Sequence, residues 1–294
     1  MDEPSASTTT DLPSQVAETE DDPEEITRSS RSNLAFAFAC LPKQQRTDMT
    51  TFYAFCRIVD DIADDPAVPV ETRREQLLGW KNLVSEITPA SKSTERALVD
   101  LLKRYPIDRE MVLEIIRGVE MDLDTARYQT YADLEAYCFR VASAVGLVSI
   151  EIFGYTDPST PKYAVELGHA LQLTNIMRDV GEDIRDDDRI YLPLEDLERF
   201  GVSEADLREA NHTEAFARMM EFQAERAESR YARARQLLAK ADRRNLRTSQ
   251  LMHSIYYALL KRMRSNGFRV LEKRCSLPKW QKIWLLIRSR VFGR

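Results

Sequence analysis

Residues 172–183 read Gln172-Leu173-Thr174-Asn175-Ile176-Met177-Arg178-Asp179-Val180-Gly181-Glu182-Asp183, a mainly apolar stretch with polar side chains spaced four residues apart. On an α-helix, residues four apart share one face, so Asn175, Asp179 and Asp183 are expected to lie on the same face. Like charges at this spacing repel each other and would weaken an isolated helix. The pattern therefore indicates a helix whose acidic face meets a cation.

A second acidic stretch lies far away in the chain. It reads Arg57-Ile58-Val59-Asp60-Asp61-Ile62-Ala63-Asp64-Asp65, and it places Asp60 and Asp64 on one helix face. A single pair of this kind is usually a solvated helix face, but two pairs among apolar neighbours are much more specific. Oxygen ligands without His or Cys are typical of Mg²⁺, which a substrate phosphate often completes. We expect the two faces to oppose each other and to hold Mg²⁺, with Mn²⁺ as an alternative, and through it a diphosphate.

The spacing of apolar residues predicts an all-α protein. The chain of 294 residues is 43% hydrophobic and contains only 9 Gly and 12 Pro. Its apolar residues recur at intervals of three and four positions, as they do along one face of a helix. No stretch alternates as a β-strand does. Helices are expected at 34–41, 44–64, 71–87, 93–104, 108–121, 131–153, 160–183, 203–209, 213–240 and 246–273, forming a single domain over residues 28–294.

The N-terminal segment differs from the rest in composition. Residues 1–25 carry nine acidic side chains and no Lys or Arg, so the remaining chain has a net charge of +3 against −6 for the whole. A segment this acidic and poor in large apolar residues cannot bury enough surface to fold, so residues 1–27 are expected to be disordered. The segment lacks the basic and apolar regions of a signal peptide.

The spacing of the cysteines and histidines and the length of the apolar runs indicate a cytoplasmic protein. The four Cys (Cys40, Cys56, Cys138 and Cys275) have no CxxC spacing, and the three His have no metal-ligand spacing. The apolar runs are shorter than the ~20 residues that a membrane-spanning helix needs. We expect a cytoplasmic protein that contacts a membrane peripherally at most, with no nucleic-acid partner.

Three arginines near the acidic stretches are suited to phosphate oxygens. Arg57 lies one turn before Asp60, Arg178 precedes Asp179, and Arg31 lies in a Ser-rich segment. Guanidinium groups bind phosphate through bidentate, charge-assisted bonds, although Arg57 and Arg178 could instead be salt-bridge partners of the aspartates. The same helices are otherwise apolar, so a pocket for a prenyl chain is expected below the charged rim, lined by Phe52, Phe55, Leu171, Ile176 and Met177.

At these residues the chain resembles the squalene/phytoene synthase family of head-to-head isoprenoid synthases. The stretch 53–64 is similar to the first aspartate-rich motif of the family, and 173–183, followed by Arg189-Ile190-Tyr191-Leu192-Pro193, is similar to the second. The stretch from Tyr137 to Gly146 is similar to the tyrosine-bearing helix between them. The resemblance runs from about Ser29 to Leu285, and it implies a single all-α bundle around a central cavity.

The resemblance also implies roles for individual residues. Metal would be held by Asp60, Asp64, Asn175, Asp179 and Asp183, with Gln172 in support. Diphosphate oxygens would be bound by Arg57, Arg178, Tyr53 and the segment Ser30-Arg31-Ser32, and Lys273 or Arg274 would add a further basic contact. Tyr137 would assist ionisation and proton transfer. Because the family commonly carries an aromatic residue after the Ser-basic-Ser run, Asn33-Leu34 departs from the pattern and weakens the assignment of Ser30, Arg31 and Ser32.

The implied reaction joins two prenyl diphosphates. One allylic donor loses diphosphate, the double bond of the second attacks the cation, and proton loss closes a cyclopropane. A second ionisation then gives phytoene, or squalene when NADPH supplies hydride. Two farnesyl diphosphates, giving presqualene diphosphate or squalene, are the first choice, and two geranylgeranyl diphosphates, giving phytoene, are the alternative. A head-to-tail elongase fits the second motif less well, and a non-catalytic helical scaffold or assembly factor would be expected to have lost its aspartates.

The C-terminal segment 279–294 carries five cationic side chains and no acids, together with Trp280 and Trp284. It is expected to be either a final helix packed on the bundle or an anchor at the membrane that receives the oily product. Peripheral membrane contact through residues 277–294 and downstream isoprenoid enzymes are therefore candidate partners.

Overall fold

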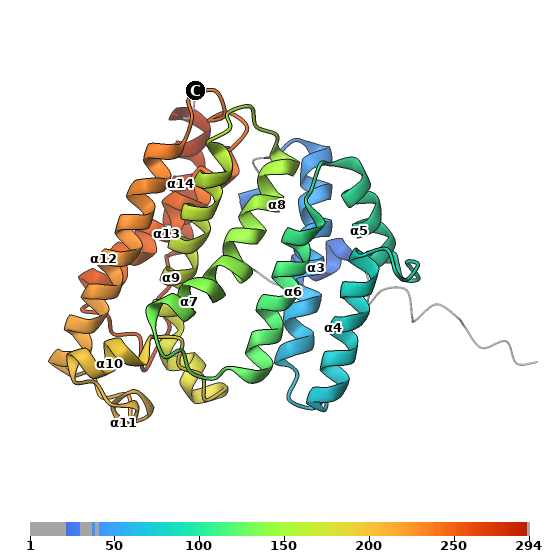
Figure 1. Ribbon diagram of the computed structural model, residues 1–294. Helices are drawn as coiled ribbons and strands as arrows, with labels where there is room; N and C mark the ends of the chain where they lie inside the picture. The colour runs from blue at the N-terminus through green and yellow to red at the C-terminus, as the bar shows by residue number, and fades with distance from the viewer. Residues whose placement is uncertain (1–21, 30–36, 39–40, 293–294) are drawn as a thin grey trace, which may run out of the picture.

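The computed structural model describes residues 22–29, 37–38 and 41–292, and within them it is an all-α bundle (Figure 1). Those residues contain no strand, and Arg127 and Ile190 form an isolated parallel bridge. The main helices are α1 (Pro23–Ser29), α3 (Lys43–Asp64), α4 (Val70–Val84), α5 (Ser93–Arg104), α6 (Arg109–Asp124), α7 (Tyr131–Cys138), α8 (Ala144–Phe153), α9 (Thr160–Asp186), α10 (Leu194–Phe200), α11 (Glu204–Arg208), α12 (Glu214–Leu237), α13 (Arg247–Ser265) and α14 (Lys279–Phe292).

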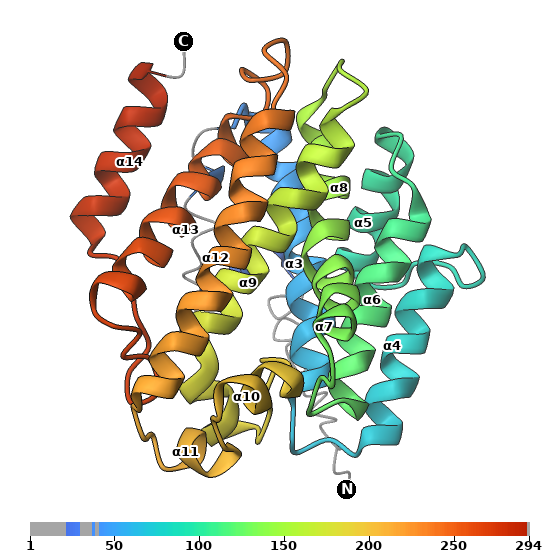
Figure 2. The ribbon, with the colours of Figure 1, turned by 60° about the vertical axis from the view of Figure 1, so that its left-hand side comes forward.

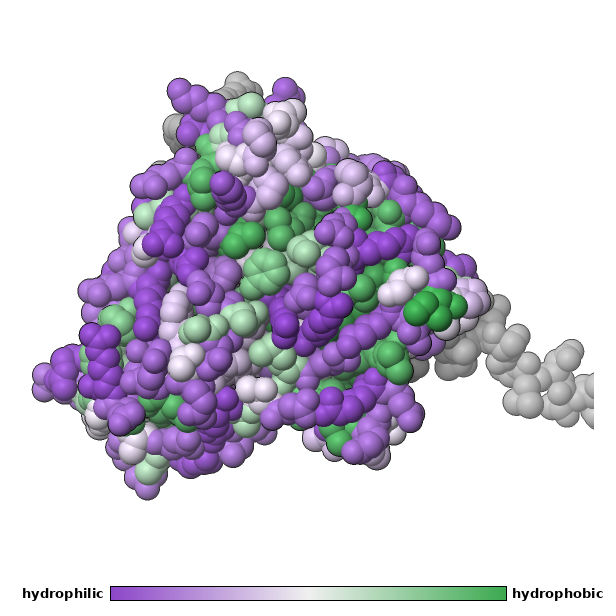
Figure 3. Space-filling model, viewed as in Figure 1, coloured by the Kyte–Doolittle hydropathy of each residue, from purple (hydrophilic) through white to green (hydrophobic). Residues whose placement is uncertain are grey.

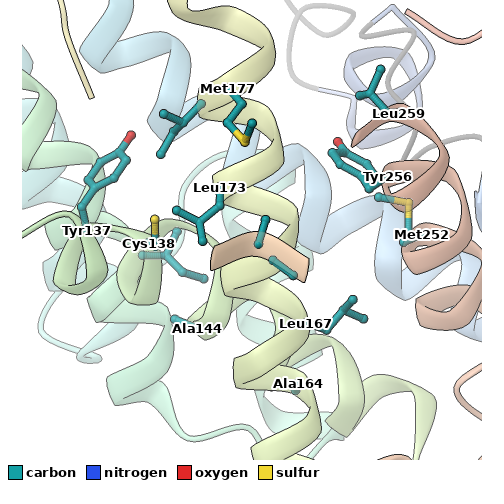
Figure 4. Close-up of a cluster of buried hydrophobic side chains, with 14 of the residues drawn as sticks. Tyr137, Cys138, Ala144, Ala164, Leu167, Leu173, Met177, Met252, Tyr256 and Leu259 are labelled. Carbon is teal, nitrogen blue, oxygen red and sulfur yellow. The ribbon is translucent and has the colours of Figure 1, made fainter. Parts of the chain in front are cut away.

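Helix α9 lies at the centre of the bundle. Its 27 residues contact α7, α8, α12 and α13, and buried side chains occur around most of its circumference, apart from the face of Asn175, Asp179 and Asp183. Figure 4 shows Leu173 and Met177 of α9 between Tyr137 on one side and Tyr256 of α13 on the other. A helix with neighbours on most of its sides is expected to be apolar over those sides. The second acidic stretch therefore belongs to the core helix of the fold.

The expected helix 131–153 is divided by a π-helical turn, η2 (Phe139–Ser143), between α7 and α8. This stretch is long and apolar enough to cross a membrane by length and composition, so the expectation that all apolar runs are too short was wrong here. In the structure it packs in the bundle against α6 and α9. Gly168 of α9 allows this approach, because a Cβ atom there would lie 2.6 Å from Ser143 Cα.

Two further boundaries differ from the expectation. The predicted helix 246–273 ends at Ser265, because the chain turns at Gly267 (φ 67°) and Phe268 (φ 56°) and then runs without regular structure to α14. Helix α10 was not predicted, and it follows directly after Pro193. The turn after α13 directs residues 268–275 back along α9.

The expected disordered segment 1–27 overlaps a helix in the structure. Pro23–Ser29 forms α1, which contacts α3, and the Thr27 hydroxyl donates a hydrogen bond to the Thr50 carbonyl at 3.3 Å. Burial of Thr27 against α3 stabilises this short helix despite the acidic composition nearby. Residues 1–21 lie outside the described residues, as does most of the expected helix 34–41.

Helix α14 lies at the outer edge of the bundle beside α13 (Figure 2). The face of the molecule in Figure 3 is largely hydrophilic, with patches of apolar residues exposed across its middle. The helices α3 to α6 form the opposite side of the bundle from α12, α13 and α14 (Figures 1 and 2).

Candidate active site

A cavity of about 460 Å³ opens between α3, α8, α9 and the start of α13. Seven of the residues predicted for the site line it: Tyr53, Arg57, Asp60, Gln172, Asn175, Arg178 and Asp179. Asp64, Asp183 and Tyr137 do not line this cavity. Ser30, Arg31 and Ser32 lie outside the described residues. The structure thus brings one part of each acidic motif to the same opening.

The cavity is charged at one end and mainly apolar at the other. Tyr163 and Asp179 of α9 both line the cavity, and the sixteen residue steps between them span roughly 24 Å at the rise of an α-helix. Small and apolar side chains cover the part away from the charges: Val141, Ala142, Gly146, Ala164, Leu167, Gly168 and Leu171. Phe153 and Tyr163 lie at that far part of the lining. This polarity suits a molecule with an anionic head and a long hydrocarbon tail.

Only one of the five residues expected to line the apolar pocket does so. Leu171 faces the cavity, whereas Ile176 and Met177 are buried in the core. Phe52 and Phe55 pack on each other, and Phe55 packs on Trp80 at 5.4 Å between ring centroids. The sequence identified the correct helices but not the faces of these side chains, because α3 and α9 are apolar on more than one side.

The first acidic motif is paired with Arg57. Its guanidinium donates to Asp60 Oδ2 at 2.7 Å and also contacts Asp61. Burial and then the charge of the neighbouring Asp64 raise the pKa of Asp60 to about 6, although Arg57 opposes the rise. When a like-charged neighbour raises the pKa of a carboxyl, any additional cation nearby stabilises its charged form.

The second acidic motif is bracketed by two arginines. Arg178 binds both carboxylate oxygens of Asp179, at 2.7 and 2.6 Å, and Arg274 donates to the same oxygens at 2.8 and 3.2 Å. Arg274 also lies 3.4 Å from Glu182. One turn further along α9, burial and then the charges of Asp179, Asp187 and Glu182 raise the pKa of Asp183 to about 8. The excess of negative charge therefore lies toward the end of α9.

Tyr137 belongs to a second polar cluster, which the sequence did not reveal as a whole. Its hydroxyl donates to Asp122 Oδ2 at 3.0 Å, and Tyr191 donates to Asp122 Oδ1 at 2.9 Å. The two tyrosine rings lie 5.2 Å apart between centroids. Burial raises the pKa of Asp122 to about 7, and Arg189 opposes the rise. Asp122 had no recognisable motif, since its partners come from distant parts of the chain.

The donor set is compatible with a divalent cation. Asn175 Oδ1, on the cavity wall, is buried and has no hydrogen-bond partner among the described residues, and its amide nitrogen lies 3.4 Å from Gln172 Oε1. A buried amide oxygen normally accepts a hydrogen bond or binds a cation, so an unpaired one indicates a missing partner. Among the described residues no three carboxylate, imidazole or thiolate groups converge on one point. Mg²⁺ commonly binds only one or two carboxylates and completes its coordination shell with water and substrate phosphate. A site without three converging protein ligands is therefore compatible with Mg²⁺.

Sequence comparisons show which known proteins this chain is similar to. The profile of a family described as squalene/phytoene synthase matches residues 27–281. A phytoene synthase of Arthrospira platensis is 36% identical over 272 residues, which cover 85% of this chain and 87% of the relative. A presqualene diphosphate synthase of Rhodopseudomonas palustris is 35% identical over 262 residues, covering 88% and 93%.

Two solved structures share the fold. A dehydrosqualene synthase in complex with a ligand aligns with a TM-score of 0.79 at 28% identity, covering 92% of this chain and 94% of that one. A squalene synthase of Alicyclobacillus acidocaldarius aligns with a TM-score of 0.74 at 28% identity, covering 84% and 93%. The family profile spans residues 27–281, so the matched region includes both acidic motifs.

Proposed function

Because the chain belongs to the squalene/phytoene synthase family, a family of head-to-head isoprenoid synthases, we propose that it joins two farnesyl diphosphates through a cyclopropylcarbinyl diphosphate. The observation that carries this proposal is the cavity itself: Arg57, Asp60, Arg178 and Asp179 stand at one end, and small apolar side chains line the rest. A diphosphate would lie at the charged end and its prenyl chain in the apolar part.

The carboxylates Asp60, Asp64, Asp179 and Asp183, together with Asn175, would hold Mg²⁺, or Mn²⁺ in its place. The ion supplies Lewis-acid stabilisation of the departing diphosphate when it is bound. Gln172 would orient Asn175, with which it is in contact. Tyr53, Arg57 and Arg178, together with Ser30, Arg31 and Ser32, would bind diphosphate oxygens, and Arg274 would add a contact from the segment after α13.

Tyr137 is proposed to act on protons during ionisation and cyclopropane closure. Burial raises the pKa of Tyr137 well above its usual value, so its hydroxyl stays protonated and donates to Asp122. Burial also raises the pKa of Asp122 to about 7, so this carboxyl can take up or release a proton near neutral pH. The apolar walls would exclude water, which would otherwise capture the cation as an alcohol.

Farnesyl diphosphate is preferred over geranylgeranyl diphosphate on the basis of the solved neighbours. Both of those at 28% identity are named for squalene-type products, which contain two farnesyl units. The second candidate is phytoene synthesis from two geranylgeranyl diphosphates, and the 36% identity to a phytoene synthase favours it. NADPH would be needed only if the product is squalene.

A comparison of donors tests the substrate assignment. The purified protein would be incubated with Mg²⁺ and equal concentrations of farnesyl and geranylgeranyl diphosphate, with and without NADPH, and the lipid extract analysed by mass spectrometry. We expect C30 products to dominate, and to become squalene only if NADPH is used. Predominance of phytoene would overturn the choice of farnesyl diphosphate but not the head-to-head reaction.

We also propose that α14 contacts a membrane surface peripherally while the catalytic bundle remains in the cytoplasm. Trp280, Ile283, Trp284 and Ile287 are 69, 49, 52 and 55% exposed, and their spacing places them on one side of the helix. Leu285, on the other side, is buried and α14 contacts α13. An exposed apolar face with Trp and nearby cations suits the interface of an anionic bilayer. Enzymes that use the oily product would act at the same surface.

Liposome sedimentation tests this contact. The intact protein is expected to sediment with vesicles containing anionic lipid, and the variant with Trp280→Ser, Ile283→Ser and Ile287→Ser is expected to stay in solution. The matched control is Leu78→Ser, which removes a similarly exposed apolar side chain, 53% exposed, from α4. Equal sedimentation of all three proteins would reject the contact.

A further inference from the structure

Arg189 is a cation that the two acidic motifs share. It lies in the connection between α9 and α10, and its Nη1 donates to Asp64 Oδ1 of α3 at 3.0 Å. Its Nη2 donates to the Asp122 carbonyl of α6 at 3.2 Å, and its Nη1 also lies 3.8 Å from Asp187 Oδ2. The Arg189 side chain is only 15% exposed, whereas that of Asp64 is 48% exposed. The guanidinium is therefore held inside the site and reaches out to an accessible carboxylate.

Arg189 also contacts the helix that carries the second acidic motif. Its backbone amide donates to the Asp183 carbonyl of α9, while its guanidinium donates to Asp64 of α3 and to the Asp122 carbonyl of α6. Arg189 is thus in the space between the motifs, where a divalent cation would also be bound.

The connection that carries Arg189 is fixed to the bundle. The Ile190 amide donates to the Ala126 carbonyl at 2.9 Å, and the Leu194 amide donates to the Tyr128 carbonyl at 2.9 Å. The Arg189 amide itself donates to the Asp183 carbonyl at 2.9 Å. These bonds on both sides of Arg189 keep its backbone in place. A change in its contacts would have to come from the side chain.

We propose that Arg189 is a built-in counter-cation that neutralises Asp64 when no divalent ion is bound, and that a divalent ion displaces it from Asp64 on binding. This inference rests on the proposed function, since it takes Asp64 as a metal ligand. Arg189 acts here as a positioning residue that lowers the affinity of the site for the ion. It prevents the clustered carboxylates from repelling one another in the ion-free protein.

The test compares Arg189→Gln with Arg208→Gln and the unchanged protein. Arg208 is the matched control, because it pairs with Asp188 in the same connection and with Glu204, but has no described contact with the acidic motifs. Binding of Mn²⁺ would be measured by electron paramagnetic resonance of the unbound ion. We expect Arg189→Gln to bind Mn²⁺ about two- to fivefold more tightly, the range set by a partly exposed ion pair, and Arg208→Gln to bind it unchanged.

Thermal unfolding gives a second readout. Without divalent ions Arg189→Gln should unfold at a lower temperature than the unchanged protein, and Mn²⁺ should raise its midpoint by more. Equal or weaker Mn²⁺ binding by Arg189→Gln, or no binding by any of the proteins, would overturn the inference. If Arg189→Gln does not fold, Arg189→Met, which also removes the charge, replaces it, and unchanged Mn²⁺ affinity of that variant would likewise overturn the inference. Product formation by the unchanged protein, measured separately, decides whether the proposed function stands.

Discussion

Gly181 allows the segment after α13 to pack directly on α9, and its replacement should have a large effect. A Cβ atom at this position would lie 2.0 Å from the Leu271 carbonyl oxygen and 2.7 Å from Leu271 Cα. These are backbone atoms, so the segment itself must move. The same segment carries Arg274, which binds Asp179 at 2.8 Å. We therefore expect Gly181→Ala to lower both stability and the affinity for prenyl diphosphate.

The magnitude follows from two opposing contributions. Replacing a helical Gly by Ala favours the helix by about 1 kcal/mol, whereas overpacking costs about 1–3 kcal/mol and more when backbone must shift. We expect a net loss of about 2 kcal/mol, which lowers the unfolding midpoint by about 4–8 °C for a chain near this size. The KM for prenyl diphosphate should rise because Arg274 is displaced.

Gly79 provides the matched control. It is an exposed glycine within α4, and a Cβ atom there would meet nothing within 4 Å. Gly79→Ala should therefore raise the free energy of unfolding by about 1 kcal/mol. Both variants would be compared by scanning calorimetry and steady-state kinetics. If Gly181→Ala were as stable as Gly79→Ala, with an unchanged KM, the close approach of residues 268–275 to α9 would be refuted.

Four other substitutions test separate parts of the molecule. Asp60→Ala or Asp179→Ala should abolish turnover while circular dichroism shows unchanged helicity, and near-normal turnover in both would reject the metal assignment. Asp196→Ala should lower the free energy of unfolding by about 3 kcal/mol or more in urea titrations, because it leaves the partly buried Arg226 and the buried Gln223 without their shared acceptor; a loss below about 1 kcal/mol would contradict this. Burial and then Arg235 lower the pKa of His253 to about 4, so the folded state loses stability as pH falls from about 6.5 toward 4, where the unfolded state binds the extra proton. His253→Phe should reduce this loss between pH 7.5 and 5 in urea titrations, and an unchanged pH dependence would disprove it.

The sequence predicted the helices and the acidic faces because both depend on local periodicity. The expected 93–104 matches α5, Ser93–Arg104, and Asp60 and Asp179 do line one cavity. The end of α13 was placed too late, since Phe268, Val270 and Leu271 continue the apolar spacing of a helix although they are buried in an irregular segment. Spacing alone cannot distinguish these two ways of burying the same side chains.

The remaining features depend on contacts between distant segments. Asp122 receives its hydrogen bonds from Tyr137 and Tyr191, and Arg189 reaches Asp64 across 125 positions of the sequence. The π-helical turn at Phe139–Ser143 arises where the chain packs closely on Gly168. Tyr137, Tyr191 and Arg189 lie in motifs that the sequence shows, but no local pattern reveals that Asp122 and Asp64 are their partners. Gly168 is an ordinary helical glycine in the sequence, so the π-helical turn is not predicted either.

Labelled substrate would show the bond that the site forms. The protein would be incubated with Mg²⁺ and farnesyl diphosphate carrying ¹³C at C1, without NADPH, and the product examined by NMR. Head-to-head coupling predicts two labelled carbons of equal intensity, one in a cyclopropane ring and one in the adjacent CH₂–O group. Label found instead in a linear head-to-tail chain, or only in farnesol, would contradict the assignment of this cavity.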